Sequence, residues 1–286
     1  MSLNWKNFTT DQIERHFNPR IAVPNFEKYI VEAQQKAKST RVKYSKYIDI
    51  PYGEHELQKL DIFCKSKLKN APVHIFIHGG YWRALDKSDH SHLAEPFINN
   101  NCLYISINYG LCPYVRLTEI TKQIKELLIW VYKNCHIYGG NPNNINISGH
   151  SAGAHLAAMI LNSNWEKLNL PANIIKSAFL VSGIYEPEVV LKLSLNKDIG
   201  LTKEEANNNT PIPCSYSTKL FLSVGDKEPN AWIEQTKRYS KLLIDHNNIV
   251  NFTLLKSQNH FSILNILSDS NSKYVNRMIE VTCNEQ

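Results

Sequence analysis

The sequence predicts an α/β protein whose mostly parallel central sheet has an antiparallel front edge and helices on both faces. Short apolar runs recur along the chain, as in strands that are buried on both faces, and helical patterns separate most of them. Near the start, two segments instead alternate polar and apolar residues, which predicts the antiparallel edge. The 286 residues fit a single domain, 1–286, of this class.

The predicted elements follow one another in a regular order. Residues 1–40 are expected to form a helical arm, in which a helix begins at the proline of PNFEKYIVEAQQKAKSTR. Two antiparallel strands are expected at 43–50 and 55–63, joined by the turn sequence PYGE. Six buried strands are then expected at 73–77, 102–107, 145–148, 177–182, 219–224 and 251–255, with the longest helical patterns at 117–134 and 230–246.

The segment 186–213 interrupts the alternation of strands and helices. It is helical in places and then rich in Asn and Pro (ANNNTPIPC), and it lies between two predicted core strands. Ligand clefts of open α/β sheets lie at the carboxyl ends of the strands. We therefore expect this insertion to form a cap over that end of the sheet.

Charge and hydropathy argue against several classes of partner. The net charge of +6 is modest and the lysines are dispersed, without a basic run interleaved with aromatic residues, so no nucleic-acid partner is expected. No apolar stretch approaches the roughly 20 residues that a membrane helix needs. The N-terminal stretch MSLNWKNFTTDQIERHF lacks the apolar core of an export signal. We expect a small-molecule substrate and no membrane association; a homo-oligomer stays possible.

The cysteines indicate a reducing compartment. None of the six forms a CxxC pair, and several lie in apolar runs, where a free cysteine behaves as a small hydrophobic residue. A reduced, cytoplasmic protein is the simplest interpretation.

The clearest chemical motif is ISGHSAGAHLA, which has Ser151 at its centre. The Gly-x-Ser-x-Gly pattern alone is weak, because small residues also gather wherever a helix packs closely on a strand. Here the serine directly follows a predicted strand, INIS, and directly precedes the helical sequence AHLAAMILN. That strand–turn–helix context is typical of a nucleophilic serine on a strained turn, where Gly149 and Gly153 allow close packing.

A second motif, HGGYW, follows the predicted strand at 73–77. Acyl transfer requires N–H donors that point at the developing oxyanion, and a glycine-rich loop presents them. We expect donors from the loop Gly79, Gly80 and Tyr81 and from Ala152 at the start of the helix. His78 is expected to brace this loop by hydrogen bonding rather than to act as a base.

A serine nucleophile needs a base, which is expected after a late strand. Of the eleven histidines, only His246 and His260 lie beyond the serine motif and its helix. His246 ends a polar helical pattern, where we expect it to be solvated. His260 follows the last predicted strand, in a loop that opens the final helix, and we predict that it is the base.

The base in turn needs an orienting acid, and the loop GDKEP offers two. Glu228 stands three residues beyond Gly225, the spacing that many hydrolases of this kind use, and we predict that it is the acid. Asp226 stays as the alternative, although it is also typical of a turn-forming residue whose side chain binds backbone N–H groups.

Other residues have weaker signals. Tyr81 and Trp82, on the glycine-rich loop, are predicted to line a substrate pocket rather than only to fill the core. The sequence DKSDHSH, with Asp86, Asp89, His90 and His92, resembles a metal site but has no partner cluster at a usable spacing. We interpret it as a solvated loop and expect neither a metal nor a cofactor.

Several motifs together resemble one known family. HGGYW, SGHSAGAHLAAM, LVSGIYEPE, LTKEEANNNTP and NHFSIL are similar to the kynurenine formamidase (arylformamidase) branch of the α/β-hydrolases, which neighbours the hormone-sensitive-lipase-like esterases. The resemblance extends over about residues 40–270. It implies a serine hydrolase whose triad is Ser151, the acid of GDKEP and His260.

The resemblance also implies a reaction. N-formylkynurenine, an intermediate of tryptophan catabolism, is the expected substrate, and a formyl group is the part removed. A short-chain carboxylesterase with the same triad is the alternative within enzymes. A non-catalytic binding protein of the same fold is a more distant one.

Overall fold

The computed structural model describes residues 4–44, 47–65 and 67–284. Its eight strands form one sheet in the order β1-β2-β4-β3-β5-β6-β7-β8. Strand β2 is antiparallel to β1 and β4, and all other neighbours are parallel. The strands are β1 (Tyr47–Pro51), β2 (Lys59–Phe63), β3 (Ala71–Ile77), β4 (Leu103–Ile107), β5 (Gly140–His150), β6 (Ile175–Val181), β7 (Lys219–Gly225) and β8 (Val250–Leu255). The predicted fold class is confirmed.

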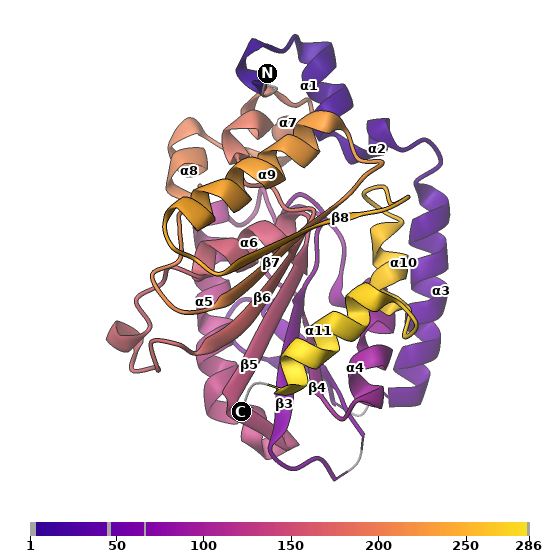
Figure 1. Ribbon diagram of the computed structural model, residues 1–286, viewed down its shortest axis with the longest axis vertical. Coiled ribbons are helices and arrows are strands. Elements are labelled where there is room, and N and C mark those ends of the chain that lie inside the picture. The colour runs from indigo at the N-terminus through magenta and orange to yellow at the C-terminus, as the bar shows by residue number, and fades with distance from the viewer. Residues whose placement is uncertain (1–3, 45–46, 66, 285–286) are drawn as a thin grey trace.

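Helices surround this sheet (Figure 1). The α-helices are α1 (Thr10–Phe17), α2 (Pro19–Ala22), α3 (Glu27–Tyr44), α4 (Glu95–Asn99), α5 (Leu117–Asn134), α6 (Ala152–Ile160), α7 (Asn196–Ile199), α8 (Lys203–Asn208), α9 (Asn230–Asp245), α10 (Ile263–Ser268) and α11 (Lys273–Asn284). Short 3-10 helices occur at η1 (Trp5–Asn7), η2 (Lys87–Ala94), η3 (Cys135–Tyr138), η4 (Glu166–Leu168) and η5 (Pro187–Lys192). None of the helices in the described ranges combines the length and the apolar character that crossing a bilayer requires.

Alternate side chains of the central strands pack into two separate cores. Ile75 and Ile77 of β3 belong to a core that includes apolar residues of α5, α6 and α9. Phe76, between them, belongs to a second core with residues of α4, α10 and α11. Since successive residues of a strand point to opposite faces, both faces of the sheet are covered at its centre, as the continuous apolar runs predicted. The strand expected to be buried at 251–255 is an exception: β8 is the edge of the sheet, and residues 251–254 are exposed.

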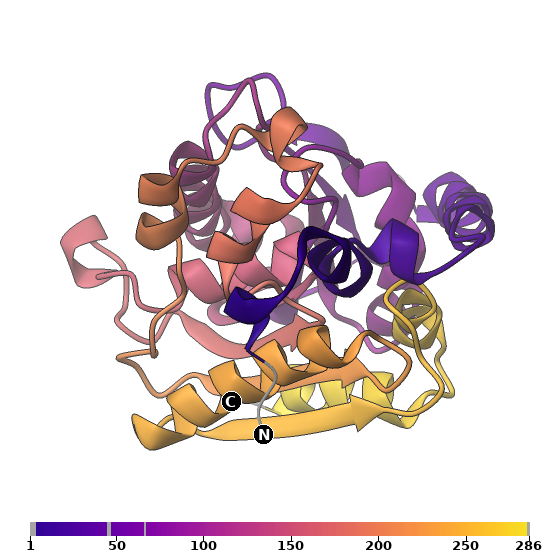
Figure 2. The ribbon, with the colours of Figure 1, turned by 90° about the horizontal axis from the view of Figure 1, so that it is seen from above.

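The N-terminal helices pack on the end of the sheet where β5 meets α6. Figure 1 shows α1, α2, α7 and α9 together at this end, and Figure 2 looks down onto them. Ile13 and Phe17 of α1 are fully buried, and the Phe17 ring lies 6.1 Å from that of Trp232 in α9. Trp5 donates a hydrogen bond from its indole N–H to Glu186. The arm is thus part of the packed structure.

Several predicted boundaries were wrong. The helix expected to begin at Pro24 begins at Glu27, and the strand expected at 145–148 extends over Gly140–His150. The strand predicted at 43–50 starts instead at Tyr47: Lys43 and Tyr44 end α3, and residues 45–46 lie outside the described residues. The strand predicted at 55–63 starts at Lys59, because the Gln58 side chain accepts a hydrogen bond from the His55 N–H and closes a turn there. The chain also continues past the predicted final helix: α10 is followed by α11.

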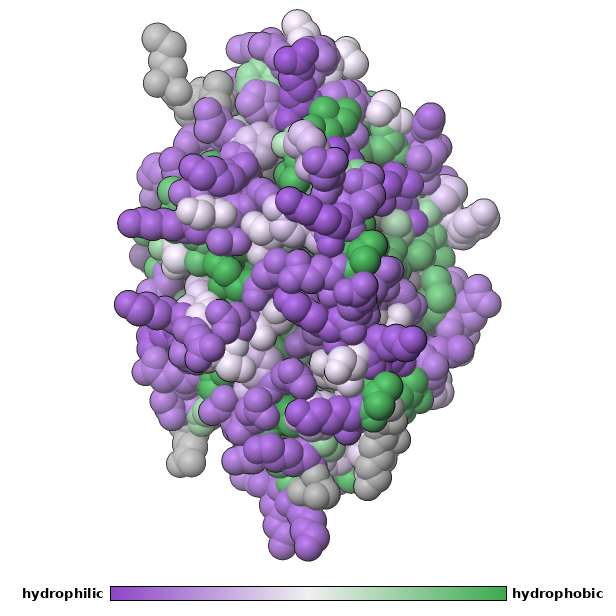
Figure 3. All heavy atoms as spheres, turned by 90° about the vertical axis from the view of Figure 1, so that its right-hand side faces the viewer, coloured by the Kyte–Doolittle hydropathy of each residue, from purple (hydrophilic) through white to green (hydrophobic). Residues whose placement is uncertain are grey.

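The face that carries α3 is largely hydrophilic. Figure 3 shows hydrophilic side chains over most of it, with apolar residues scattered between them. Exposed Val31 and Val42 belong to this helix, whereas Ala33 and Ala37 are buried against the body of the protein. Small buried residues let α3 lie close to η2, which it contacts.

Candidate active site

Ser151 occupies a sharp turn between β5 and α6. Strand β5 ends at His150 and α6 begins at Ala152, so a single residue connects them. Its backbone has φ 56° and ψ −120°, a strained conformation for a residue with a side chain. The Ser151 N–H donates to the carbonyl oxygen of Val181 at 2.9 Å, which holds the turn against β6.

The two glycines of the motif are required by packing. A Cβ atom on Gly149 would lie 2.3 Å from the carbonyl oxygen of Gly153. A Cβ atom on Gly153 would lie 2.0 Å from the carbonyl oxygen of Ile77, at the end of β3. Both distances are far below van der Waals contact with backbone atoms that cannot rotate away. The close approach of α6 to β3 and β5 therefore depends on both glycines.

Gly153→Ala is expected to lower the free energy of unfolding by about 3 kcal/mol, because overpacking forces the backbone to move. Gly200→Ala is the matched control. Gly200 has φ +69°, but the nearest heavy atom to an added Cβ is 3.8 Å away, so only a backbone strain of roughly 1–2 kcal/mol is expected there. Urea unfolding followed by circular dichroism measures both. Equal losses in the two variants would contradict the packing argument.

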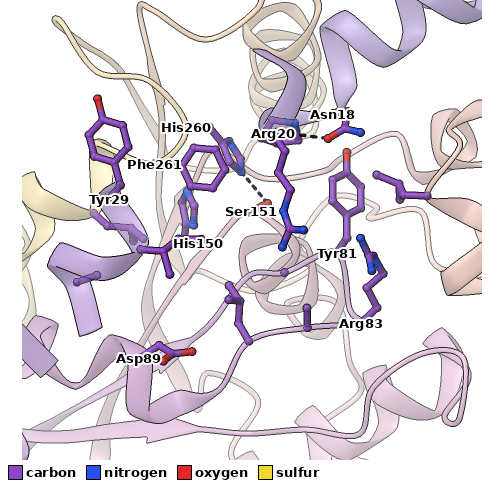
Figure 4. Close-up of a pocket in the computed structure, with 18 of the residues that line it drawn as sticks. Asn18, Arg20, Tyr29, Tyr81, Arg83, Asp89, His150, Ser151, His260 and Phe261 are labelled. Atoms are coloured by element: carbon purple, nitrogen blue, oxygen red, sulfur yellow. Dashed lines mark hydrogen bonds between the residues drawn. The ribbon is translucent and has the colours of Figure 1, made fainter. Parts of the chain in front are cut away.

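His260 and Glu228 approach Ser151 in a continuous chain of hydrogen bonds. His260 Nε2 lies 3.0 Å from Ser151 Oγ, and His260 Nδ1 lies 2.7 Å from Glu228 Oε2. The three side chains follow the carboxyl ends of β5, β7 and β8, which lie in the same half of the sheet: β7 and β8 are neighbours, and β6 separates β5 from β7. Dashed lines in Figure 4 mark the contact of the histidine with the serine.

Glu228 is held in a fully buried position. Its Oε1 accepts hydrogen bonds from the Gly225 N–H at 2.9 Å and from the Ser182 hydroxyl, and its side chain is 0% exposed. Trp232 donates to the Ser182 carbonyl oxygen at 3.1 Å and places its ring 4.8 Å from that of His260. The Gly225 and Ser182 donors thus fix Oε1 of Glu228, and Oε2 is left to bind His260.

The other acid and the other late histidine lie elsewhere. Asp226 donates its N–H to the Leu255 carbonyl oxygen, and its buried Oδ1 atom has no hydrogen-bond partner among the described residues. Its side chain makes no hydrogen bond to His260. His246 is exposed at the end of α9, where its ring contacts the Leu242 carbonyl oxygen.

The loop 79–82 lies directly against the serine. A Cβ atom on Gly79 would lie 3.0 Å from Ser151 Cβ. Gly80, Tyr81 and Trp82 all have positive φ angles, of 104°, 50° and 58°. Among the described residues, the N–H groups of Gly80 and Tyr81 donate to no protein backbone or side chain.

Ala152 opens α6, so its N–H has no partner within the helix. Together these groups can supply donors beside Ser151, as an oxyanion hole requires.

His78 braces the loop that precedes these donors. Its Nδ1 lies 2.8 Å from the Gly79 carbonyl oxygen. Tyr109 stacks on the His78 ring at 4.5 Å and donates its hydroxyl hydrogen bond to the His78 carbonyl oxygen at 2.8 Å. Burial is the main cause that lowers the pKa of His78 to about 4, so the ring is neutral near pH 7. A neutral His78 donates to the carbonyl and fixes the loop.

His150 packs directly on the base and was missed by the sequence reasoning. Its ring lies 4.7 Å from that of His260. Burial, followed by the charges of His260 and His90, holds the pKa of His150 well below its usual range. The residue is therefore neutral near pH 7 and does not oppose a positive charge on His260.

A cavity of about 330 Å³ opens in front of Ser151 and His260. Figure 4 shows how side chains from distant parts of the chain surround it. The N-terminal arm contributes Asn18, which precedes α2, Arg20 of α2 and Tyr29 of α3. The glycine-rich loop contributes Tyr81, and Arg83 follows it. The rest of the wall includes Phe261, next to His260, and four residues of the predicted cap segment: Ser194, Leu195, Lys197 and Asp198. The arm residues carry no motif, so no sequence signal could have identified them.

The two aromatic residues predicted to line the pocket differ in position. Tyr81 lines the cavity and donates its hydroxyl hydrogen bond to the Phe17 carbonyl oxygen. Burial raises the pKa of Tyr81, so its hydroxyl stays protonated. Trp82, by contrast, does not line the cavity. It is fully buried in the core and donates from its indole N–H to His155 Nδ1 at 3.2 Å.

The sequence DKSDHSH is not the solvated loop that was expected. It forms η2, and the Asp86 side chain accepts a hydrogen bond from the Ser88 N–H at its start. His90 and His92 are buried beneath α3 and the sheet. Across the described ranges, no three His, Cys, Asp or Glu side chains gather in a group that could hold a metal ion.

Comparison with known proteins places the chain among hydrolases. The family model BD-FAE matches residues 60–188, a range that contains both the glycine-rich loop and the serine turn. Kynurenine formamidase of Danio rerio is 29% identical over 283 residues, which cover 94% of this chain and 94% of the relative.

Solved structures agree with this placement. A candidate thioesterase from Silicibacter sp. is 25% identical, with a TM-score of 0.78, and covers 92% of this chain and 98% of its own. An esterase from the archaeon Pyrobaculum calidifontis has a TM-score of 0.71 at 15% identity and covers 96% of each chain, which shows a shared fold.

Proposed function

We propose that this chain, an α/β-hydrolase of the formamidase and esterase type, is an arylformamidase that removes the formyl group of N-formylkynurenine. The observation that carries the proposal is the chain of hydrogen bonds from Glu228 through His260 to Ser151, next to the N–H groups of the 79–81 loop. Similarity to kynurenine formamidase over nearly the whole chain supports the choice of substrate.

In the proposed acylation step, His260 Nε2 takes the proton of Ser151 Oγ as the oxygen attacks the formyl carbon. Glu228 accepts the Nδ1–H hydrogen bond of His260 and stabilises the positive charge that the ring acquires. The carbonyl oxygen becomes an oxyanion and accepts hydrogen bonds from Ala152 and the loop 79–81. When the intermediate collapses, the C–N bond breaks and His260 gives its proton to the aniline nitrogen.

Deacylation repeats these roles with water. After the aryl amine leaves, a water molecule takes its place beside His260. His260 removes a proton from the water, which attacks the formyl carbon of the acylated Ser151. Collapse of this second intermediate breaks the bond to Oγ, returns the proton to Ser151 and releases formate.

The walls of the cavity suit an aryl substrate with a very short acyl group. Phe261 stacks on Phe26 with ring centroids 5.3 Å apart, and on Tyr29 at 6.5 Å, so aromatic faces flank the base. On the other side, Tyr81 is fixed by its hydrogen bond to Phe17. A formyl group needs the least space between this rigid loop and Ser151.

The purified protein is expected to hydrolyse N-formylkynurenine with a kcat/KM of about 10⁴ M⁻¹s⁻¹ or more. Release of kynurenine is followed by absorbance, and p-nitrophenyl acetate serves as the ester control. Turnover of the ester alone would assign a short-chain carboxylesterase, which uses the same groups. Turnover of neither, together with no labelling of Ser151 by a fluorophosphonate, would assign a non-catalytic binding protein.

A further inference from the structure

The charges around the cavity are unevenly neutralised. Arg83 pairs with Asp198 at 3.3 Å. Asp89 accepts hydrogen bonds from the Gln34 amide at 3.0 Å and from the backbone N–H of Asp86 at 3.3 Å. Arg20 forms no ion pair with any residue in the described part of the chain. The cavity wall therefore presents a guanidinium that pairs with none of the carboxylates of the described residues.

The contacts that position Arg20 leave the N–H groups of its guanidinium free to bind a ligand. It belongs to α2, and its backbone N–H donates to the Asn18 side chain at 3.3 Å. Its guanidinium carbon lies 5.2 Å from the centre of the Phe26 ring, and Phe26 stacks in turn on Phe261, next to the base. A cation over an aromatic ring uses the face of the guanidinium, which leaves the N–H groups at its edge available.

The side chain reaches toward the reacting groups. Figure 4 shows Arg20 extending from α2 into the cavity, between Phe261 on one side and Tyr81 on the other. Ser151 and His260 line the same cavity. A ligand whose acyl group meets Ser151 thus has its remaining part within the volume that Arg20 borders. Arg20 and Lys197, the two unpaired cations of the wall, are both exposed residues, but Lys197 on α7 has no aromatic ring to orient it in the described structure.

We propose that Arg20 binds a carboxylate on the leaving-group part of the substrate and so selects aryl substrates that bear a carboxylate. This inference rests on the proposed function, because N-formylkynurenine carries an α-carboxylate remote from its formyl amide. A guanidinium edge and a carboxylate form two parallel charge-assisted hydrogen bonds, which fix orientation as well as affinity. The N-terminal arm then contributes specificity, since it brings Arg20 to a site that the hydrolase core builds.

The test compares N-formylkynurenine with its methyl ester at the α-carboxyl group, which keeps the α-amino group but lacks the carboxylate. Arg20→Gln is expected to lower kcat/KM for the acid by about 10–100-fold, mostly through KM, since hydrogen bonds to charged groups contribute about 1.5–3 kcal/mol. Turnover of the methyl ester is expected to change by less than about threefold. Arg20→Lys, which keeps the charge but not the fork, should recover part of the preference for the acid.

Arg15→Gln is the matched control. Arg15 belongs to the same arm but is exposed on α1 and pairs with Asp11 at 2.9 Å, away from the cavity. It should leave both substrates unaffected. Equal losses on acid and methyl ester in Arg20→Gln would show a general effect on the arm and overturn the proposal, as would no loss on the acid.

A second pair of substrates separates failure of the proposed arylformamidase function from failure of the proposed role of Arg20. If the native protein cleaves no formyl amide, 4-acetoxybenzoate and its methyl ester provide the same contrast of a leaving group with and without a carboxylate. Arg20→Gln should then reduce turnover of 4-acetoxybenzoate selectively. No selectivity in this pair would overturn the role of Arg20, whatever acyl group the protein removes.

Discussion

Ser151→Ala is expected to lower kcat for N-formylkynurenine by about 10⁵-fold or more, because loss of a serine nucleophile removes the covalent route altogether. Ser151 Oγ is the hydroxyl that lies 3.0 Å from the Nε2 atom of His260. The remaining donors and the cavity still bind substrate, so KM should change much less than kcat. Initial rates with N-formylkynurenine and with p-nitrophenyl acetate measure the loss for an amide and an ester.

The matched control is Ser163→Ala. Ser163 is also a buried serine, three residues beyond α6, but its hydroxyl has no hydrogen-bond partner in the described structure and does not line the cavity. Its variant should keep native activity and label with a fluorophosphonate, whereas Ser151→Ala should not label. Retention of more than about 1% of native kcat by a folded Ser151→Ala protein would remove this serine from the mechanism.

The strands and the positions of Ser151, Glu228 and His260 were predictable because each is marked by a short, local sequence pattern. Each buried strand is a short apolar run, and the groups that meet at the site follow strand ends in a fixed order along the chain. Gly149 and Gly153 mark the turn because a Cβ atom at either position would collide with backbone. The parallel sheet then brings His260 and Glu228 to the same edge as Ser151.

The predictions failed where the residues that pack around a side chain come from segments distant in the sequence. Trp82 is adjacent in sequence to a residue that lines the cavity, but its indole is buried in the core against His155, which comes from α6. His90 and His92 are in a polar sequence, yet α3 covers them. Arg20 and Tyr29 reach the cavity only because the arm folds back across the end of the sheet. Periodicity carries no information about such long-range packing.

Glu228→Gln is expected to lower kcat by about 10⁴-fold while the protein stays folded, because an uncharged amide cannot stabilise the protonated base or enforce its tautomer. Glu228 Oε2 lies 2.7 Å from His260 Nδ1, and Oε1 is occupied by the Gly225 N–H and the Ser182 hydroxyl. The amide keeps the size of the carboxylate, so the cavity and substrate contacts are retained. Steady-state kinetics with N-formylkynurenine measures the change.

Asp226→Asn tests whether His260 depends on direct contact with Glu228 or only on a negative charge nearby. Asp226 is on the same loop, two residues away, yet its N–H is bonded to Leu255 and its side chain makes no hydrogen bond to His260. Removing its charge should change kcat by less than about threefold, since a half-buried charge without direct contact is screened by solvent. If Asp226→Asn lost as much activity as Glu228→Gln, both carboxylates would have to act on His260. A loss confined to Glu228→Gln assigns the orienting charge to the one carboxylate that touches the base.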